Sequence, residues 1–318
     1  MKLGIIGTGR IVAEALTVLE NEREIELNAI FARPHSRAAG EELASRYRIP
    51  AVYTDYGELL AEADIDTVYI GLINSVHYEY AKQALESGKN VILEKPFTGT
   101  TEEAEELFCI ARESKLFLFE AITVLHNGVI ERMRESMPML GKIRIMQANF
   151  SQYSSRYGRY LAGIVDPSFD RECQGGALRD INIYNIHFAA ALFGVPQRVE
   201  YYQNTGFNGV DTSGVLVMQY DGFVSVCTAA KDSDSPCFVM VQGEKGYMRM
   251  DSKPNAPSNL TTVLIGEEGA ESHYTEDLPH RMTGEFRDFA RMIDKKDHES
   301  AAFYERETLD AMRILDMI

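Results

Sequence analysis

The sequence contains no tryptophan, only four cysteines among 318 residues, and fewer basic than acidic side chains. The cysteines are Cys109, Cys173, Cys227 and Cys237. They form no C-x-x-C pair and have no histidine at the spacing of a zinc site, which argues against a bound metal. We therefore expect reduced thiols, no metal site and a cytoplasmic location.

Long apolar runs and a positive charge balance are also missing. The formal net charge is -16, from 48 acidic and 32 basic residues, so a nucleic-acid backbone would be repelled. No apolar stretch reaches membrane-spanning length, and the apolar segment directly after Met1 leaves no room for a signal peptide. A hydrophobic content of 45% is enough for a sizeable core, and the length predicts about two domains.

Short apolar runs alternate with helical patterns over residues 1–120. The apolar runs cover residues 3–6, 25–31, 52–53, 67–72, 91–93 and 116–119. The helical patterns cover residues 10–20, 36–47, 56–61, 76–87 and 101–114. Strands that are buried on both faces read as continuous apolar runs, and strand–helix alternation predicts a doubly wound parallel sheet. We therefore expect an α/β dinucleotide-binding domain over residues 1–120.

Segments rich in β-branched and aromatic residues predominate over residues 121–318. They cover residues 142–153, 198–204, 215–220, 224–230, 237–242, 247–250 and 260–265. Turn signals such as Asp221-Gly222 separate several of them, which predicts a large, mostly antiparallel sheet in an α+β domain. Two amphipathic helices, at residues 283–293 and 305–318, are assigned to this second domain.

A glycine turn joins the first apolar run to a helical pattern. Glycines let the backbone approach a ligand, and the N-terminus of the following helix attracts a phosphate. This predicts that a dinucleotide pyrophosphate binds Gly7, Thr8, Gly9, Arg10 and Ile11. The pattern G-x-G-x-x-G/A requires a small residue at its third conserved position, but this chain has Val12 there.

The segment after the second run decides which dinucleotide is expected. An NAD site usually has Asp or Glu there, to accept from the ribose 2′-hydroxyl, whereas this chain has Arg33-Pro34-His35-Ser36. Arg33 is suited to pair with a 2′-phosphate, with His35 and Ser36 as further donors. The alternative is a solvated loop arginine. The missing carboxylate favours NADP over NAD.

Two further strand ends carry candidate site residues. Asn74 and His77 follow the fourth run, and Glu94-Lys95-Pro96 ends the fifth. Ligands of open α/β sheets bind outside the carboxyl ends of the strands, so all five residues are candidate cofactor contacts. Pro96 ends its strand and keeps Lys95 out of the α region, near the nicotinamide end of a dinucleotide. The alternatives are a solvated lysine and a solvated first-turn histidine.

A long helical pattern over residues 175–194 opens with two glycines. Asp180, Tyr184 and His187 lie in it at positions i, i+4 and i+7, which puts them on one face. Packing of the tyrosine and the histidine against a core is the alternative to a functional role.

Three motifs together resemble the Gfo/Idh/MocA oxidoreductase family over essentially the whole chain. They are Gly7-Thr8-Gly9-Arg10-Ile11, Glu94-Lys95-Pro96 and Gly175-Gly176-Ala177-Leu178-x-Asp180-x-x-x-Tyr184. The resemblance implies a Rossmann domain, a C-terminal open sheet that serves as a dimer or tetramer interface, a cis Lys95–Pro96 bond, and substrates that are sugars, polyols or diols. Tyr184 places the chain with the glucose-fructose oxidoreductase and dihydrodiol dehydrogenase branch, because inositol dehydrogenase-like members carry histidine there.

The resemblance also implies catalytic roles for Lys95, Asp180 and Tyr184 in hydride transfer between NADP, or alternatively NAD, and a CH–OH or carbonyl group. Tyr184 would accept the hydroxyl proton. A free phenol titrates near pH ~10, and a neighbouring ammonium would favour the phenolate. Lys95 would supply that charge and hydrogen-bond the substrate oxygen. Asp180 would orient the substrate or Lys95, and His187 would relay a proton, contact substrate or pack.

The residues that surround the substrate are the least constrained. We expect Tyr153, Arg156 and Tyr157 at its rim and His126 and His187 as further contacts. The segment before His126 lacks the arginine that this family often carries after Glu-Ala.

Two other functions fit the same fold. One is a sensor that binds a dinucleotide without turnover, as in galactose-pathway repressors, and the other is NAD-assisted glycoside cleavage. The complete set of Lys95, Asp180 and Tyr184 favours redox chemistry, because a pure sensor has no need of it.

Overall fold

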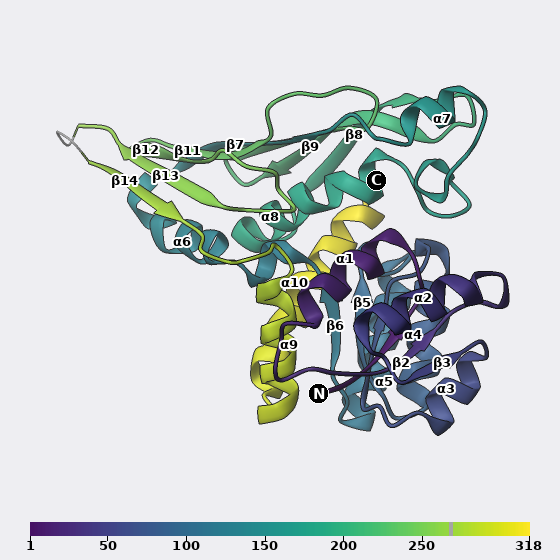
Figure 1. The fold of residues 1–318 in the computed structure, drawn as a ribbon. Coiled ribbons are helices and arrows are strands. Elements are labelled where there is room, and N and C mark those ends of the chain that lie inside the picture. Colours follow the sequence, from purple (N-terminus) through teal and green to yellow (C-terminus); the bar gives the residue numbers. More distant parts are fainter. Residues whose placement is uncertain (267–269) are drawn as a thin grey trace. The chain divides into compact units, whose positions relative to one another are not determined.

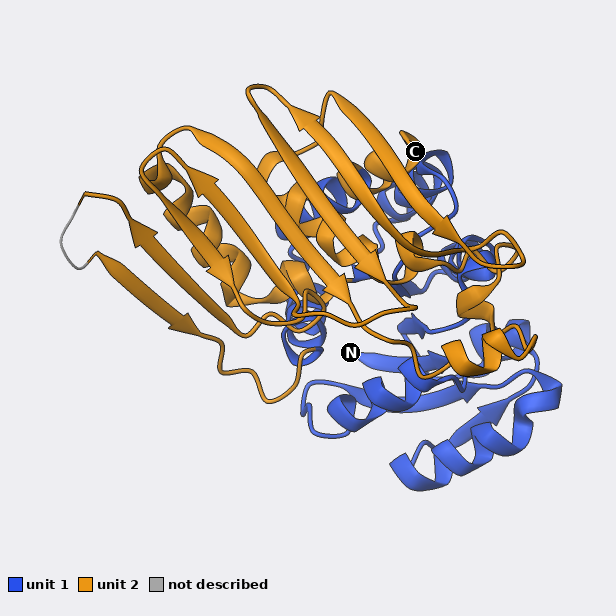
Figure 2. Cartoon of the chain, turned by 90° about the horizontal axis from the view of Figure 1, so that it is seen from above, with its two compact units in different colours: residues 1–121, 282–309 blue, residues 122–281, 310–318 orange. Residues whose placement is uncertain are grey.

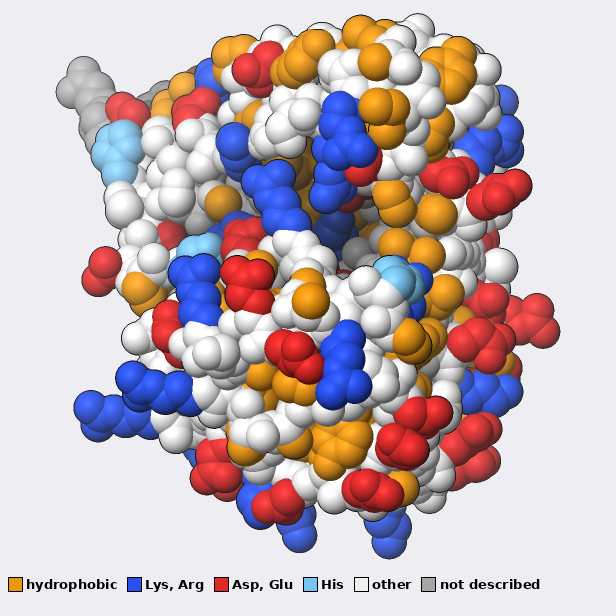
Figure 3. Space-filling model, turned by 45° about the vertical axis from the view of Figure 1, so that its right-hand side comes forward, with side chains coloured by type: hydrophobic (Ala, Val, Ile, Leu, Met, Phe, Trp, Pro, Cys, Tyr) orange, Lys and Arg blue, Asp and Glu red, His pale blue; other side chains and the backbone are white. Residues whose placement is uncertain are grey.

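The computed structural model describes residues 1–266 and 270–318, and these divide into two compact units (Figures 1 and 2). Unit 1 comprises Met1–Ala121 and Met282–Leu309, and unit 2 comprises Ile122–Arg281 and Asp310–Ile318. Within the described residues, no helix combines the length and the apolar character that crossing a membrane requires. On the face shown in Figure 3, acidic and basic side chains are interspersed.

The described residues of unit 1 form a six-stranded sheet in the order β3-β2-β1-β4-β5-β6. Neighbouring strands are parallel throughout, and the strand order reverses between β1 and β4, as in a doubly wound dinucleotide-binding fold. The strands are β1 (Lys2–Ile6), β2 (Glu26–Phe31), β3 (Ala51–Tyr53), β4 (Thr67–Ile70), β5 (Asn90–Glu94) and β6 (Leu118–Ala121). The predicted parallel sheet is confirmed.

Two of the helices between these strands, α3 and α5, begin at a side-chain cap. For example, Thr100 accepts from the N–H of Glu103 and the Glu103 carboxylate accepts from the N–H of Thr100, which closes a capping box at the start of α5. The helices are α1 (Arg10–Leu19), α2 (Arg37–Tyr47), α3 (Tyr56–Glu62), α4 (His77–Glu86) and α5 (Thr101–Ser114).

The two C-terminal helices, α9 (Thr283–Lys295) and α10 (His298–Asp316), differ from the expectation. Residues 282–309 belong to unit 1 instead of the second domain to which the sequence analysis assigned them. On α9, Phe286 meets Tyr69 edge-on at 5.4 Å and Phe289 stacks on Phe119 at 4.7 Å, so the helix covers the parallel sheet. The periodicity identifies an apolar helix face, but it does not say which sheet that face covers.

The described residues of unit 2 form an eight-stranded sheet in the order β14-β13-β12-β11-β7-β10-β9-β8. Strands β7 and β10 pair in parallel, and the other neighbours are antiparallel, which confirms the mostly antiparallel prediction. The strands are β7 (Ile143–Ser151), β8 (Arg198–Thr205), β9 (Asp211–Tyr220), β10 (Phe223–Ala230), β11 (Phe238–Gly243), β12 (Gly246–Met250), β13 (Asn259–Leu264) and β14 (Glu271–Thr275). The helices are α6 (Gly128–Ser136), α7 (Tyr157–Leu161) and α8 (Ile183–Phe193).

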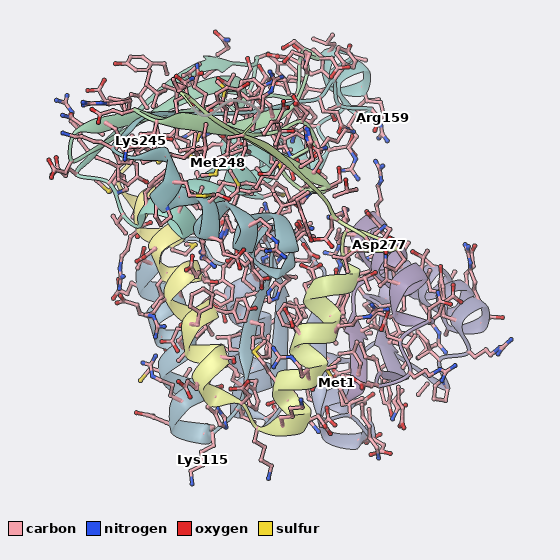
Figure 4. The ribbon with its side chains drawn as sticks, turned by 90° about the vertical axis from the view of Figure 1, so that its left-hand side faces the viewer. Met1, Lys115, Arg159, Lys245, Met248 and Asp277 are labelled. Carbon is pink, nitrogen blue, oxygen red and sulfur yellow. The ribbon has the colours of Figure 1, made fainter. Side chains whose placement is uncertain are left out.

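This sheet has one covered and one open face. Helices α6 and α8 lie on the covered face (Figure 1), where Met146 and Met248 are fully buried; Figure 4 labels Met248 on β12. Figure 2 looks onto the other face, where the strands lie in front of these helices. A single row across β12, β11, β7 and β10 places Tyr247, Ile145 and Val224 on this face, and each is 38% to 41% exposed.

Candidate active site

The turn after β1 is built around Gly7. Its φ is +119°, a conformation that residues with a side chain rarely adopt, and a Cβ there would lie 2.7 Å from the carbonyl oxygen of Gly71. Its N–H donates to the carbonyl oxygen of Phe31 at 3.0 Å. The turn after β1 is thereby held to the end of β2.

Gly9 stands at the N-cap of α1. Among the described residues, a Cβ on Gly9 would meet only the carbonyl oxygen of Gly71, at 3.9 Å, so the packing of the chain does not require glycine there. In the same part of the chain, no side chain caps α1 and no acidic residue stands in its first turn. The first N–H groups of α1, from exposed Arg10 and half-buried Ile11 onward, are therefore suited to an anion. A pyrophosphate fits beside these N–H groups, where a Cβ on Gly9 would partly fill the space. We call the turn Gly7–Gly9 together with this helix end the glycine cradle.

Val12 stands where the glycine motif requires a small residue, and a glycine after the neighbouring strand β4 makes room for it. Val12 is fully buried, and a Cβ on Gly71 would lie 2.6 Å from Cγ2 of Val12 and 3.3 Å from Cγ2 of Ile11. Gly71 follows β4, so the side chain that it lacks is what lets α1 pack closely on the sheet. The contact between α1 and the sheet therefore does contain a small residue, but it is Gly71 in the sheet instead of residue 12 in the helix.

In the segment Arg33–Ser36 after β2, the basic side chains are exposed to solvent. Arg33 and His35 are exposed and Ser36 is half-buried, with Arg33 directly before the 3-10 helix η1 (Pro34–Ser36). On α2, a Cβ on Gly40 would lie 2.7 Å from Cβ of Ala32 and 3.7 Å from Cγ2 of Thr8. The segment that carries Arg33 therefore lies beside the glycine turn, at the edge where a dinucleotide would extend toward its adenosine half.

His77, at the start of α4, is fully buried, unlike the crevice or solvent positions that the sequence analysis considered. Its Nδ1 is 2.9 Å from the carbonyl oxygen of Pro96 and its Nε2 is 3.3 Å from that of Leu72. Burial lowers the pKa of His77, so the ring is neutral at pH 7. The ring of His77 thus packs against the turn that carries Lys95, which favours a bracing role, and its cofactor contact stays a prediction.

The Glu94-Lys95-Pro96 segment combines buried and accessible parts. The Lys95–Pro96 bond is cis, as the resemblance implies. Glu94 is buried and accepts a 2.7 Å hydrogen bond from the hydroxyl of Tyr69, while Lys95 is half-buried. Asn74, also half-buried, begins the 3-10 helix η2 (Asn74–Val76) after β4.

In unit 2, the predicted helix over residues 175–194 begins differently. A π-helical turn, η6 (Leu178–Asn182), precedes α8, so the spacing of a single α-helix does not apply to Asp180. Gly176 has a φ of +116°, and a Cβ there would lie 1.9 Å from Oδ1 of Asp211. The other carboxylate oxygen accepts from the N–H of Leu178 at 2.6 Å and from the hydroxyl of Tyr201 at 2.7 Å. Gly176 thus makes room for the carboxylate that binds the start of the helix.

Asp180 forms an ion pair that the sequence analysis did not foresee. Its Oδ2 lies 2.7 Å from Nζ of Lys231, which is only 3% exposed, while Asp180 is 30% exposed. Tyr184 is buried, with its ring edge-on to Phe150 at 5.8 Å. His187 is fully buried, which supports the packing alternative over substrate contact.

The predicted rim residues divide by exposure. Tyr153 is 51% exposed and meets the ring of Tyr157, on α7, edge-on at 5.5 Å. Arg156 directly precedes α7 and its guanidinium donates to the hydroxyl of Ser168 at 3.4 Å. His126 ends the 3-10 helix η3 (Thr123–His126) and is buried, whereas Tyr153 is exposed.

Sequence reasoning missed Asp211 and Lys231. Lys231 directly follows an apolar strand, as Lys95 does, and that position was its only signal. Asp211 begins β9 and gave none. In residues 1–266 and 270–318, no group of three or more His, Cys, Asp and Glu side chains is placed to hold a metal ion.

The doubly wound sheet, the glycine turn and the uncapped helix define unit 1 as a dinucleotide-binding unit. A family model described as an oxidoreductase family with an NAD-binding Rossmann fold matches residues 1–121, and a model of the GFO/IDH/MocA C-terminal domain matches residues 138–249. The chain therefore belongs to the Gfo/Idh/MocA oxidoreductase family, which confirms the resemblance.

Individual relatives agree with this assignment. The chain is 32% identical to scyllo-inositol 2-dehydrogenase (NADP(+)) IolU of Bacillus subtilis (strain 168) over 252 residues, 79% of this chain and 76% of that one. It is 31% identical to trans-1,2-dihydrobenzene-1,2-diol dehydrogenase of Sus scrofa, over 84% of this chain and 78% of that one. The fold resembles crystalline KijD10, a 3-ketoreductase from Actinomadura kijaniata in complex with NADP and TDP-benzene, with a TM-score of 0.83, 24% identity and coverage of 98% and 97%.

The buried His77 leads to a pH dependence of stability. The unfolded chain binds a proton at His77 as the pH falls through the ordinary value of 6.5, while burial opposes this in the folded state. The free energy of unfolding therefore falls below that pH, by up to about 1.4 kcal/mol per pH unit from this residue, and is unaffected above it. His77→Gln lacks this pH-dependent part of the free energy of unfolding. The difference in free energy of unfolding between wild type and variant therefore becomes smaller as the pH falls.

Urea unfolding between about pH 7.5 and about pH 5.5 measures this difference. The control is His273→Gln, which removes an exposed histidine on β14. A constant difference between wild type and His77→Gln would contradict the bracing role of a neutral ring.

Proposed function

We propose that the protein is an NADP-dependent dehydrogenase or reductase that transfers a hydride between the nicotinamide and the CH–OH or carbonyl carbon of a sugar, polyol or diol. The observation that carries this is the glycine cradle at the uncapped N-terminus of α1, in a chain that keeps Lys95, Asp180 and Tyr184. The names of the two relatives above support the substrate class, because an inositol and a dihydrodiol both carry adjacent secondary hydroxyl groups.

NADP is proposed over NAD because of the segment after β2. Exposed Arg33 and His35 stand where a carboxylate would accept from the ribose 2′-hydroxyl of NAD, and a guanidinium suits a 2′-phosphate. The name of the Bacillus relative includes NADP(+), which agrees with this choice.

Each proposed catalytic residue has one task. Bound NADP supplies the hydride acceptor or donor. Tyr184 accepts the proton of the hydroxyl that is oxidised and returns it when a carbonyl is reduced. Lys95 hydrogen-bonds the substrate oxygen as negative charge develops on it, and Asp180 orients the substrate through its hydroxyl groups.

Removal of the Tyr184 hydroxyl tests the proton transfer. In Tyr184→Phe, kcat falls by about 10²- to 10⁴-fold, the usual contribution of one general acid–base group, while the Kd of NADPH is unchanged. Steady-state assays with inositols, aldoses and diols, and a fluorescence titration of NADPH, measure the two quantities. Tyr78→Phe is the control, because it removes a surface hydroxyl that donates to Glu106.

Two outcomes of this experiment count against the proposal in different ways. Unchanged kcat in Tyr184→Phe would reject the role of that residue alone. No turnover by the wild type with NADP or NAD across the panel would reject the dehydrogenase function.

The choice of cofactor is tested at Arg33. In Arg33→Ser, the KM for NADP rises by about 10- to 100-fold, because a charge-assisted hydrogen bond to the 2′-phosphate is lost, while the KM for NAD changes little. The neighbouring Arg37, which pairs with Glu41 at 2.8 Å, gives the control Arg37→Ser with both values near wild type. An equal rise for both cofactors would show that Arg33 does not read the 2′-phosphate.

We also propose that the protein is a homodimer or homotetramer assembled through the open face of the sheet in unit 2. The row of Tyr247, Ile145 and Val224 gives that face apolar side chains that an interface would bury. A cytoplasmic location is proposed because the four cysteines, all within the described residues, are free.

Sedimentation analysis tests the assembly. The double variant Ile145→Glu, Val224→Glu places two carboxylates in the interface and reduces the mass to that of a monomer. Leu161→Glu, at a 63% exposed position on α7, leaves the assembly intact. A wild-type protein that sediments as a monomer at micromolar concentration would contradict the proposed interface.

A further inference from the structure

Lys231 is a buried ammonium with a complete set of partners. It follows β10 directly and is 3% exposed. Its Nζ lies 2.7 Å from Oδ2 of Asp180, donates to the carbonyl oxygen of Ser168, and lies 4.2 Å from the ring centroid of Phe169. A buried ammonium is costly unless it is paired and hydrogen-bonded, and these contacts meet that requirement.

The main chain of Lys231 is anchored at the end of the sheet. Its N–H donates to the carbonyl oxygen of Thr212 at 2.8 Å, and its carbonyl oxygen accepts from the N–H of Ser154 at 2.9 Å. Ser154 follows the exposed Tyr153, and Ser168 lies in the 3-10 helix η5 (Pro167–Phe169) further along the same connection. Lys231 thus links the end of β10 to Ser154, to Ser168 and to the turn that carries Asp180.

The two partners of the ion pair differ in access. Asp180 keeps 30% of its side chain exposed, so a ligand is able to reach it, while the ammonium is covered by Ser168, Phe169 and Asp180 itself. Any effect of Lys231 on a substrate therefore passes through the carboxylate. We propose that Lys231 is a positioning residue, which holds the Asp180 carboxylate in the orientation that binds substrate and ties it to the segment of Tyr153. This inference rests on the proposed function, because it assumes that Asp180 contacts substrate.

Substitution of Lys231 separates positioning from general stability. In Lys231→Met, kcat/KM falls by about 10- to 100-fold, the loss expected for one charge-assisted hydrogen bond, while the Kd of NADPH stays at the wild-type value. Lys231→Arg keeps the charge and restores part of the activity. Lys245→Met, in the exposed turn before β12 (Figure 4), is the matched control and retains full activity.

A double-mutant cycle with Asp180→Asn identifies the route of the effect. If Lys231 acts through Asp180, then Lys231→Met has little further effect on kcat/KM in the Asp180→Asn background. Equal effects in both backgrounds, or a loss that Lys231→Arg does not relieve and that follows the thermal midpoint, would overturn the inference. If Lys231→Met does not fold, the same cycle is run with Lys231→Arg, whose change in kcat/KM must also vanish in the Asp180→Asn background.

The wild type distinguishes this inference from the function on which it rests. Turnover by the wild type together with unchanged kcat/KM in Lys231→Met overturns the positioning role alone. No turnover by the wild type across the substrate panel overturns both.

Discussion

In unit 1, the turns that follow neighbouring strands are held by one another. The N–H of Gly7 binds the carbonyl oxygen of Phe31, and the N–H of Gly71 binds that of Ile6. The neutral ring of His77 lies between the carbonyl oxygens of Leu72 and Pro96 and has one N–H to donate to one of them. Backbone polar groups at the carboxyl end of a parallel sheet need partners that no further strand provides. By satisfying one another, these groups fix the turns that a dinucleotide would contact before any ligand arrives. Preorganisation of this kind is what electrostatic stabilisation of a reacting group requires.

In unit 2, charged side chains hold the start of the helix that carries Asp180. Two carboxylates organise the start of its central helix: Asp211 binds the N–H of Leu178, and Asp180 pairs with Lys231. The first contact is possible because Gly176 lacks a side chain where Asp211 approaches. Both contacts are made within the π-helical turn, and such turns are frequent at functional sites.

Departures from a motif are informative when the facing residue is known. Val12 breaks the glycine fingerprint of the first turn, yet Gly71, directly after the facing strand β4, supplies the missing space. The fingerprint describes one side of a contact, whereas packing constrains the sum of both sides. A related argument applies to His77, a polar residue near a strand end that proves to be buried, with a lowered pKa.

The sequence by itself determined the order of strands and helices in residues 1–120, the parallel and antiparallel sheets, the glycine turn and the Glu94-Lys95-Pro96 segment. These follow from local periodicity and from the backbone restrictions of glycine and proline, which need no knowledge of distant residues. The sequence analysis missed β14, α6 and α7, which are short. Only the tertiary structure decided that residues 282–309 cover the first sheet, that His77 faces Pro96, and that Asp180 pairs with Lys231. Such partners come from segments far apart in the chain, and a pattern of apolar and polar residues records that a side chain is buried without recording what it is buried against.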